Sequence, residues 1–151
     1  MNDTNTTSNL GEITITRTYN APRDLVFECM ITPEHLTHFW GPVGVHTPLD
    51  RIKIDPRPGG VFDTVMVNDS DGEEYPTHGV FVEVDRPNKL VWTEPDVEGG
   101  MTSALTFTDL GDGRTEVTIL QTNVPEMYRS PEAQAGMQSS LDRFAAYVQS
   151  L

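Results

Sequence analysis

The sequence predicts an α+β domain in which an antiparallel sheet packs against one long C-terminal helix. Apolar and polar residues alternate over successive segments between about residues 46 and 122, as they do in strands with one covered face. Short turn-forming segments separate these strands, which favours consecutive hairpins. After residue 130 the apolar residues recur every three to four positions, which indicates an amphipathic helix.

The first part of the chain predicts a tail, a strand and two short helices. Residues 1–10 are polar and are expected to form a disordered tail, so that residues 11–151 make up the single domain. Alternation around Ile13 predicts the first strand. Helix start signals follow at Pro22 and at Thr32-Pro33, because proline fits the first turn of a helix. The whole sheet is expected to hold about six or seven strands.

The last predicted helix is about 20 residues long and begins with a strong capping signal. Ser130 is a good N-cap residue, and Pro131 fits the first helical position. Met137, Leu141 and Phe144 form part of its apolar stripe. We expect the stripe to be buried against the sheet, whose covered face is the one large apolar partner that the pattern provides.

Composition excludes several classes of function. Ten Lys and Arg residues face 23 Asp and Glu residues, and the net charge of −13 argues against nucleic-acid binding. No apolar run approaches the roughly 20 residues that span a bilayer, and the N-terminus lacks a signal peptide. Cys29 is the single cysteine, so a cysteine-based zinc site is excluded. We expect a cytoplasmic protein without membrane insertion, metal or cofactor; a homodimer is compatible with the sequence, which defines no interface.

Several segments, in their order along the chain, resemble the SRPBCC (START-related) superfamily, and within it the group of the activator of heat-shock-protein-90 ATPase. The resemblance spans about residues 12–150 and rests on the following segments: residues 13–17 with 20–27, 32–36 with 39–42, 58–60, 79 with 83–85 and 87, 90–94, 113–115 and 139–144. It implies a helix-grip fold, in which a curved antiparallel sheet wraps around the C-terminal helix and leaves a mostly apolar cavity. Members of the superfamily bind lipids, polyketides and other hydrophobic molecules, and some are cyclases or hydrolases. This chain departs from the group at Met137, where a tryptophan is frequent.

The leading hypothesis for function is the binding of a hydrophobic or aromatic small molecule, lipid-like or polyketide-like, between the sheet and the C-terminal helix. Ligand pockets are mostly apolar with a few placed polar groups. The candidate lining residues fall on faces expected to point inward, although the same residues can simply fill a core: Trp40, Met66, His78, Trp92, Leu105, Phe107, Met137, Leu141 and Phe144.

Two alternatives stay open. The first is an enzyme of the cyclase, dehydratase or hydrolase kind in which His78 acts with Glu94 or Arg17. His78 is in phase with Val80, Val82 and Val84, which predicts that it lies on the covered face. Arg17 and Glu94 are in phase with apolar neighbours on their own strands, although both can also lie in solvent beyond the covered region. The second alternative is a chaperone-interaction module, which requires an exposed apolar patch.

Overall fold

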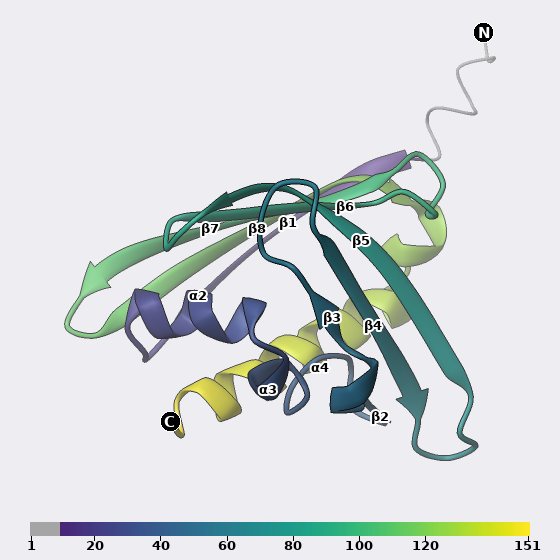
Figure 1. Cartoon of the computed structure of the whole chain (residues 1–151), viewed down its shortest axis with the longest axis horizontal. Coiled ribbons are helices and arrows are strands. Elements are labelled where there is room, and N and C mark those ends of the chain that lie inside the picture. Colours follow the sequence, from purple (N-terminus) through teal and green to yellow (C-terminus); the bar gives the residue numbers. More distant parts are fainter. Residues whose placement is uncertain (1–9) are drawn as a thin grey trace, which may run out of the picture.

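A bent antiparallel sheet of eight strands forms the frame of the protein in a computed structural model that describes residues 10–151 (Figure 1). The strand order is β1-β8-β7-β6-β5-β4-β2, and β3 also pairs with β4. The strands are β1 (Leu10–Tyr19), β2 (Val45–His46), β3 (Lys53–Ile54), β4 (Val61–Asn68), β5 (Glu74–Asp85), β6 (Lys89–Glu94), β7 (Met101–Gly111) and β8 (Arg114–Pro125). The predicted tail over residues 1–9 lies outside the described residues, and Leu10 already belongs to β1.

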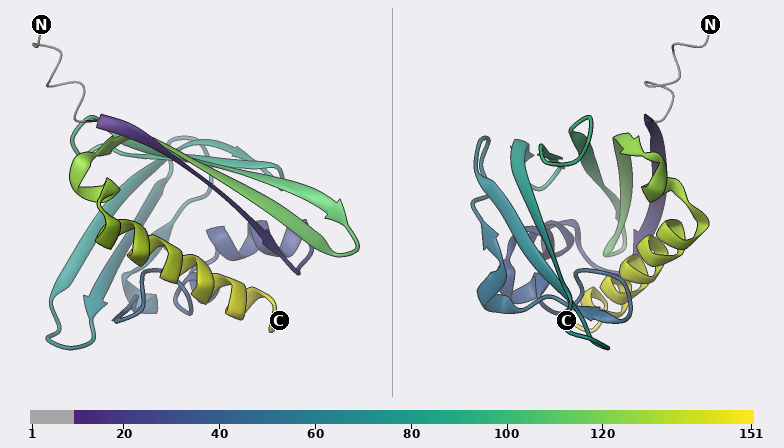
Figure 2. Two further views of the ribbon diagram at one scale, coloured as in Figure 1. Left: turned by 180° about the vertical axis from the view of Figure 1, so that it is seen from behind. Right: turned by 90° about the vertical axis from the view of Figure 1, so that its right-hand side faces the viewer.

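The three α-helices of residues 10–151 lie on the concave side of the sheet, and Figure 2 shows α4 running along that side. Two 3₁₀ turns complete the fold. The elements are α2 (Arg23–Ile31), α3 (Pro33–Leu36), η1 (Leu49–Arg51), η2 (Glu126–Arg129) and α4 (Pro131–Val148). The predicted α+β helix-grip fold is confirmed. The sheet has more strands than expected because β2 and β3 are two residues long, too short to show alternation.

The start of α4 follows the capping signal in the sequence. The Ser130 hydroxyl accepts a hydrogen bond from the backbone N–H of Ala133 at 3.1 Å, and Pro131 occupies the first turn. The second short helix, α3, begins at the predicted signal and ends already at Leu36. Thr32 does not cap it, because its hydroxyl donates to the Glu28 carbonyl of the preceding helix at 2.7 Å.

The core lies between the sheet and the helices. Leu105, Phe107, Leu141 and Phe144 are buried in it, as expected for inward-facing residues. The ring of Phe144 lies 4.5 Å from that of Phe39 between centroids. The inner face of α4 is therefore fixed against the core through its C-terminal half.

Candidate functional site

The sheet opens between β5 and β6, and the candidate site lies at this opening. Strand β5 pairs with β6 only from Val80 onward, where Val80 faces Thr93. The first half of β5 instead continues alongside β4, while β6 ends at Glu94. In Figure 1 the β4–β5 pair bends away from the rest of the sheet. Because of this split, the first half of β5 has no hydrogen-bonded strand on the side of β6.

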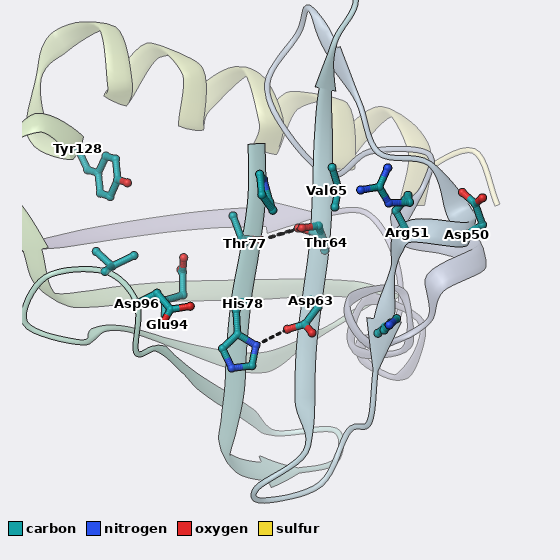
Figure 3. Close-up of a pocket in the computed structure, with 13 residues that line it drawn as sticks. Asp50, Arg51, Asp63, Thr64, Val65, Thr77, His78, Glu94, Asp96 and Tyr128 are labelled. Carbon is teal, nitrogen blue, oxygen red and sulfur yellow. Dashed lines mark hydrogen bonds and ion pairs between the residues drawn. The ribbon is translucent and has the colours of Figure 1, made fainter. Parts of the chain in front are cut away.

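A pocket of about 720 Å³ occupies the split (Figure 3). Its walls come from η1, β3, β4, β5, the end of β6, the following loop and η2. Its lining is more polar than the apolar cavity expected from the sequence. It holds four carboxylates and two cationic side chains, beside one histidine and one tyrosine. The lining residues are Asp50, Arg51, Lys53, Asp63, Thr64, Val65, Pro76, Thr77, His78, Glu94, Asp96, Val97 and Tyr128.

His78 lines the pocket, but the prediction that it lies on the covered face is wrong. Gly79 and Phe81 are the buried residues of this strand, and Val82 is 55% exposed. A β-bulge between Phe81 and Glu83 inserts one residue into β5, which reverses the alternation. Val84 is therefore in phase with Phe81 and not with His78.

The His78 imidazole is held by a carboxylate on the neighbouring strand. Its Nδ1 lies 2.6 Å from Oδ1 of Asp63, its direct cross-strand partner, and both side chains are partly exposed. The hydrogen bond to Asp63 raises the pKa of His78, since it favours the charged imidazolium. His78 is thus paired with Asp63, a residue that the sequence patterns did not single out, and not with Glu94 or Arg17.

Glu94 and Arg17 both face inward, but they lie in different parts of the molecule. Glu94 lies on the same face of β6 as Trp92 and lines the pocket, where burial raises the pKa of its carboxyl. Arg17 forms an ion pair with Asp142 of α4 and does not line the pocket. The three groups proposed for acid–base chemistry therefore do not converge on one point.

An aromatic cluster lies directly behind the pocket. The Phe62 ring lies 5.0 Å from Trp92 and 5.3 Å from Trp40, and Phe81 stacks on Phe62 at 5.4 Å. Thr64, a lining residue, is two positions from Phe62 on the same face of β4. The aromatic cluster is thus next to the pocket, although its rings do not line it.

The sequence analysis predicted only some of the residues in the aromatic cluster and the pocket lining. Trp40 and Trp92 belong to the aromatic cluster, whereas Phe62 and Phe81 were missed. Phe62, Thr64 and Met66 share one face of the predicted strand, so the inward direction of Phe62 could be found from the pattern. The aspartates of the pocket carried no comparable signal, because Asp63 and Asp96 are brought to it by the pairing and the bend of the sheet.

The predicted residues differ in their exposure. Trp40, Met66 and Met137 are partly exposed, whereas Leu105, Phe107, Leu141 and Phe144 are buried in the packed core. Among residues 10–151, no three His, Cys, Asp or Glu side chains are grouped to hold a metal ion. No helix within the same residues has the length and apolarity needed to cross a membrane.

The bent sheet, the helix held along its concave side and the pocket at the split define a protein of the helix-grip class. The chain belongs to the family of activator of Hsp90 ATPase homolog 1-like proteins, whose family model matches residues 20–149. The resemblance in the sequence is therefore confirmed. A search of curated proteins found no match to the chain.

Solved structures of other proteins share the fold over nearly the whole chain. A protein from Chromobacterium violaceum has a TM-score of 0.82 at 23% identity, covering 91% of this chain and 97% of that one. An AHSA1-like protein from Aeromonas hydrophila has a TM-score of 0.77 at 23% identity, with 92% of each chain covered. The AHSA1 protein from Silicibacter pomeroyi gives 0.73 at 22%, covering 89% and 95%. At these identities the likeness shows the fold alone.

Proposed function

We propose that the chain binds a hydrophobic or aromatic small molecule, which enters at the split between β5 and β6. The carrying observation is a pocket of about 720 Å³ whose lining residues Thr64 and Glu94 are two positions along their strands from Phe62 and Trp92 of the aromatic cluster. Pockets for small molecules commonly measure about 300–1,000 Å³ and place a few polar groups beside apolar and aromatic walls. Both the size of the pocket and the aromatic cluster next to it support this function.

The partly exposed members of the predicted set are the ones that we assign to ligand contact. Met66 shares the inward face of β4 with the lining residue Thr64. Met137 lies on α4 and packs against the core with part of its surface exposed. Methionine adapts its shape to a ligand, since its side chain is unbranched and polarizable. Leu105, Phe107, Leu141 and Phe144 form the fixed wall behind them.

A fluorescent probe tests this function directly. N-phenyl-1-naphthylamine is apolar and uncharged at neutral pH, and we expect saturable binding with energy transfer from the tryptophans. Thr77→Phe places a ring at the pocket lining and should weaken binding at least tenfold. Thr108→Phe is the matched control on an exposed position of β7 and should bind as the unchanged protein does. Equal binding by both variants, or a signal that does not saturate, would argue against the pocket as the site.

The alternative functions receive less support from the geometry. Arg17 is engaged by Asp142, and His78 lies on the opposite face of β5 from Phe81 and the aromatic cluster. An acid–base pair of His78 with Glu94 or Arg17 is therefore not proposed. The family match concerns the domain fold, and the described residues give no reason to prefer a chaperone as partner.

A further inference from the structure

Glu94 is a polar group that a purely apolar ligand would leave without a partner. It stands at the boundary between the pocket and the aromatic cluster, on the same face as Trp92. Its carboxyl makes no hydrogen bond or ion pair with any residue of the range 10–151, whereas burial has removed part of its water. A partly dehydrated carboxylate is stabilised by a cationic or hydrogen-bonding partner.

The surroundings of Glu94 do not supply that partner. The cations of the pocket are remote from it or engaged. Arg51 contacts Glu74 at 3.3 Å, and His78 contacts Asp63. Lys53 lies on β3, which β4 and β5 separate from β6 in the sheet. In Figure 3 Arg51 lies across β4 and β5 from Glu94, while Asp96 lies beside Glu94 on the side of Tyr128. The second carboxylate adds to the negative potential at this end of the pocket.

We infer that the ligand is an arylalkylamine, whose protonated nitrogen pairs with Glu94 while its aryl ring lies toward Trp92, on the same face of β6. The inference rests on the proposed function and names the class of ligand for the same pocket. Glu94 and Trp92 are two residues apart on one strand, so their side chains stand about 7 Å apart along it. An aryl group with its amine on a short alkyl arm meets both. Aromatic faces attract cations as well, which adds to the attraction of the carboxylates.

Three ligands with one ring system distinguish this inference from general apolar binding. They are 2-(1-naphthyl)ethylamine, 2-(1-naphthyl)ethanol and 1-naphthylacetate, titrated by calorimetry at pH 7. A hydrogen bond to a charged group is worth about 1.5–3 kcal/mol, so the amine should bind at least tenfold more tightly than the alcohol. The acid should bind most weakly, because the pocket carries an excess of carboxylates.

Glu94→Gln tests the assigned residue, with Glu98→Gln as its matched control. Both substitutions remove one negative charge, and Glu98 is an exposed residue of the loop after β6 that does not line the pocket. The ratio of amine to alcohol affinity should fall below about threefold in Glu94→Gln and stay above tenfold in Glu98→Gln. Melting curves of both variants establish that they are folded.

The outcomes separate the inference from the proposed function. Equal affinity of the unchanged protein for amine and alcohol overturns the amine class, and so does binding of N-phenyl-1-naphthylamine without binding of the amine. An equal loss of preference in both variants overturns the role of Glu94 and indicates an effect of net charge. Failure of N-phenyl-1-naphthylamine and all three ligands to bind overturns the proposed function itself.

Discussion

At the scale of single residues, Glu94 ties ligand binding to stability. Its pKa is raised by burial, so the folded state binds the proton more tightly than the unfolded state does. The folded protein is favoured while Glu94 is protonated, and this advantage is lost as the pH rises from the ordinary carboxyl pKa through the raised one. An ionised Glu94 without a ligand therefore lowers the free energy of unfolding at neutral pH.

We expect Glu94→Gln to raise the melting temperature at pH 7 in the absence of ligand. For a domain of this size, each kcal/mol corresponds to roughly 2–4 °C. The gain should shrink as the pH is lowered toward 4, where the native carboxyl is protonated as well. Thermal unfolding followed by circular dichroism at both pH values measures it, with Glu98→Gln as the control for net charge. A lower melting temperature than that of the unchanged protein at pH 7 would show that Glu94 has a stabilising partner.

The pair of His78 and Asp63 gives a second prediction for single residues. The pKa of His78 is raised by its hydrogen bond to Asp63, so the pair adds stability below the ordinary histidine pKa and loses it as the pH rises through the raised value. Asp63→Asn should lower the pKa of His78, which NMR titration of the imidazole measures. Because both side chains are partly exposed, the cost in stability should be about 0.2–1 kcal/mol.

Asp69→Asn serves as the comparison for that measurement. Asp69 pairs with His46, and both residues are more exposed than His78 and Asp63. This substitution should leave the titration of His78 unchanged. A shift of His78 in Asp69→Asn, or none in Asp63→Asn, would contradict the assignment of the hydrogen bond.

The alternation of apolar and polar residues predicted the inward face of β1 correctly, because that strand is regular there. It failed for β5, which contains a bulge. Arg17 shares the inward face of β1 with its apolar neighbours, as its phase predicted, because β1 alternates without interruption along this stretch. His78 was placed on the wrong face because the alternation that joins it to Val84 is interrupted by a bulge at Val82. A bulge depends on the pairing between two strands, which the sequence of one strand does not record.

At the scale of elements, α4 holds the segment that leads from α3 into the sheet. One guanidinium nitrogen of Arg143 donates to the carbonyls of Gly41, Pro42 and Val45, at distances of 2.9, 3.1 and 3.1 Å. This tether fixes the residues that follow Trp40 beside the helix. No pattern in the sequence predicts this tether, since three backbone acceptors are brought to one side chain only by the fold.

Arg143→Lys should lower the free energy of unfolding by about 1–2 kcal/mol, because an ammonium group at the end of a flexible chain does not reproduce the geometry of the guanidinium. Urea unfolding measures the loss. Arg114→Lys, at an exposed position at the start of β8, is the matched control and should change stability by less than about 0.5 kcal/mol. Equal effects of the two substitutions would mean that the tether contributes nothing to stability.

The elements themselves followed the sequence closely where a local signal existed. The cap at Ser130 and the stripe through Leu141 and Phe144 predicted the start and the buried face of α4. The strands β2 and β3 were not predicted, because two residues are too few to show the alternation typical of a strand. Their pairing with β4 instead depends on where the chain returns after α3.

At the scale of the whole molecule, the order of the elements was sufficient to predict the helix-grip architecture, but not the position of its opening. The opening exists because β5 pairs with β6 only over its second half. Its first half extends beyond β6 and pairs with β4 alone. Its length was visible in the sequence, whereas the bend between the two halves was not. The acidic character of the pocket follows from that bend, since it brings Asp63 and Glu94 to one place.

The net charge of −13 predicts how a charged ligand reaches this pocket. A protein of one predominant charge attracts ions of the opposite sign over a distance that salt shortens, from about 30 Å at 0.01 M to about 3 Å at 1 M. The association rate of 2-(1-naphthyl)ethylamine should therefore fall several-fold between 10 mM and 1 M salt, as measured by stopped-flow quenching of tryptophan fluorescence. The rate for 2-(1-naphthyl)ethanol should stay nearly constant, because it has no charge to attract. A parallel fall for both ligands would assign the effect of salt to the protein itself and not to steering of the amine.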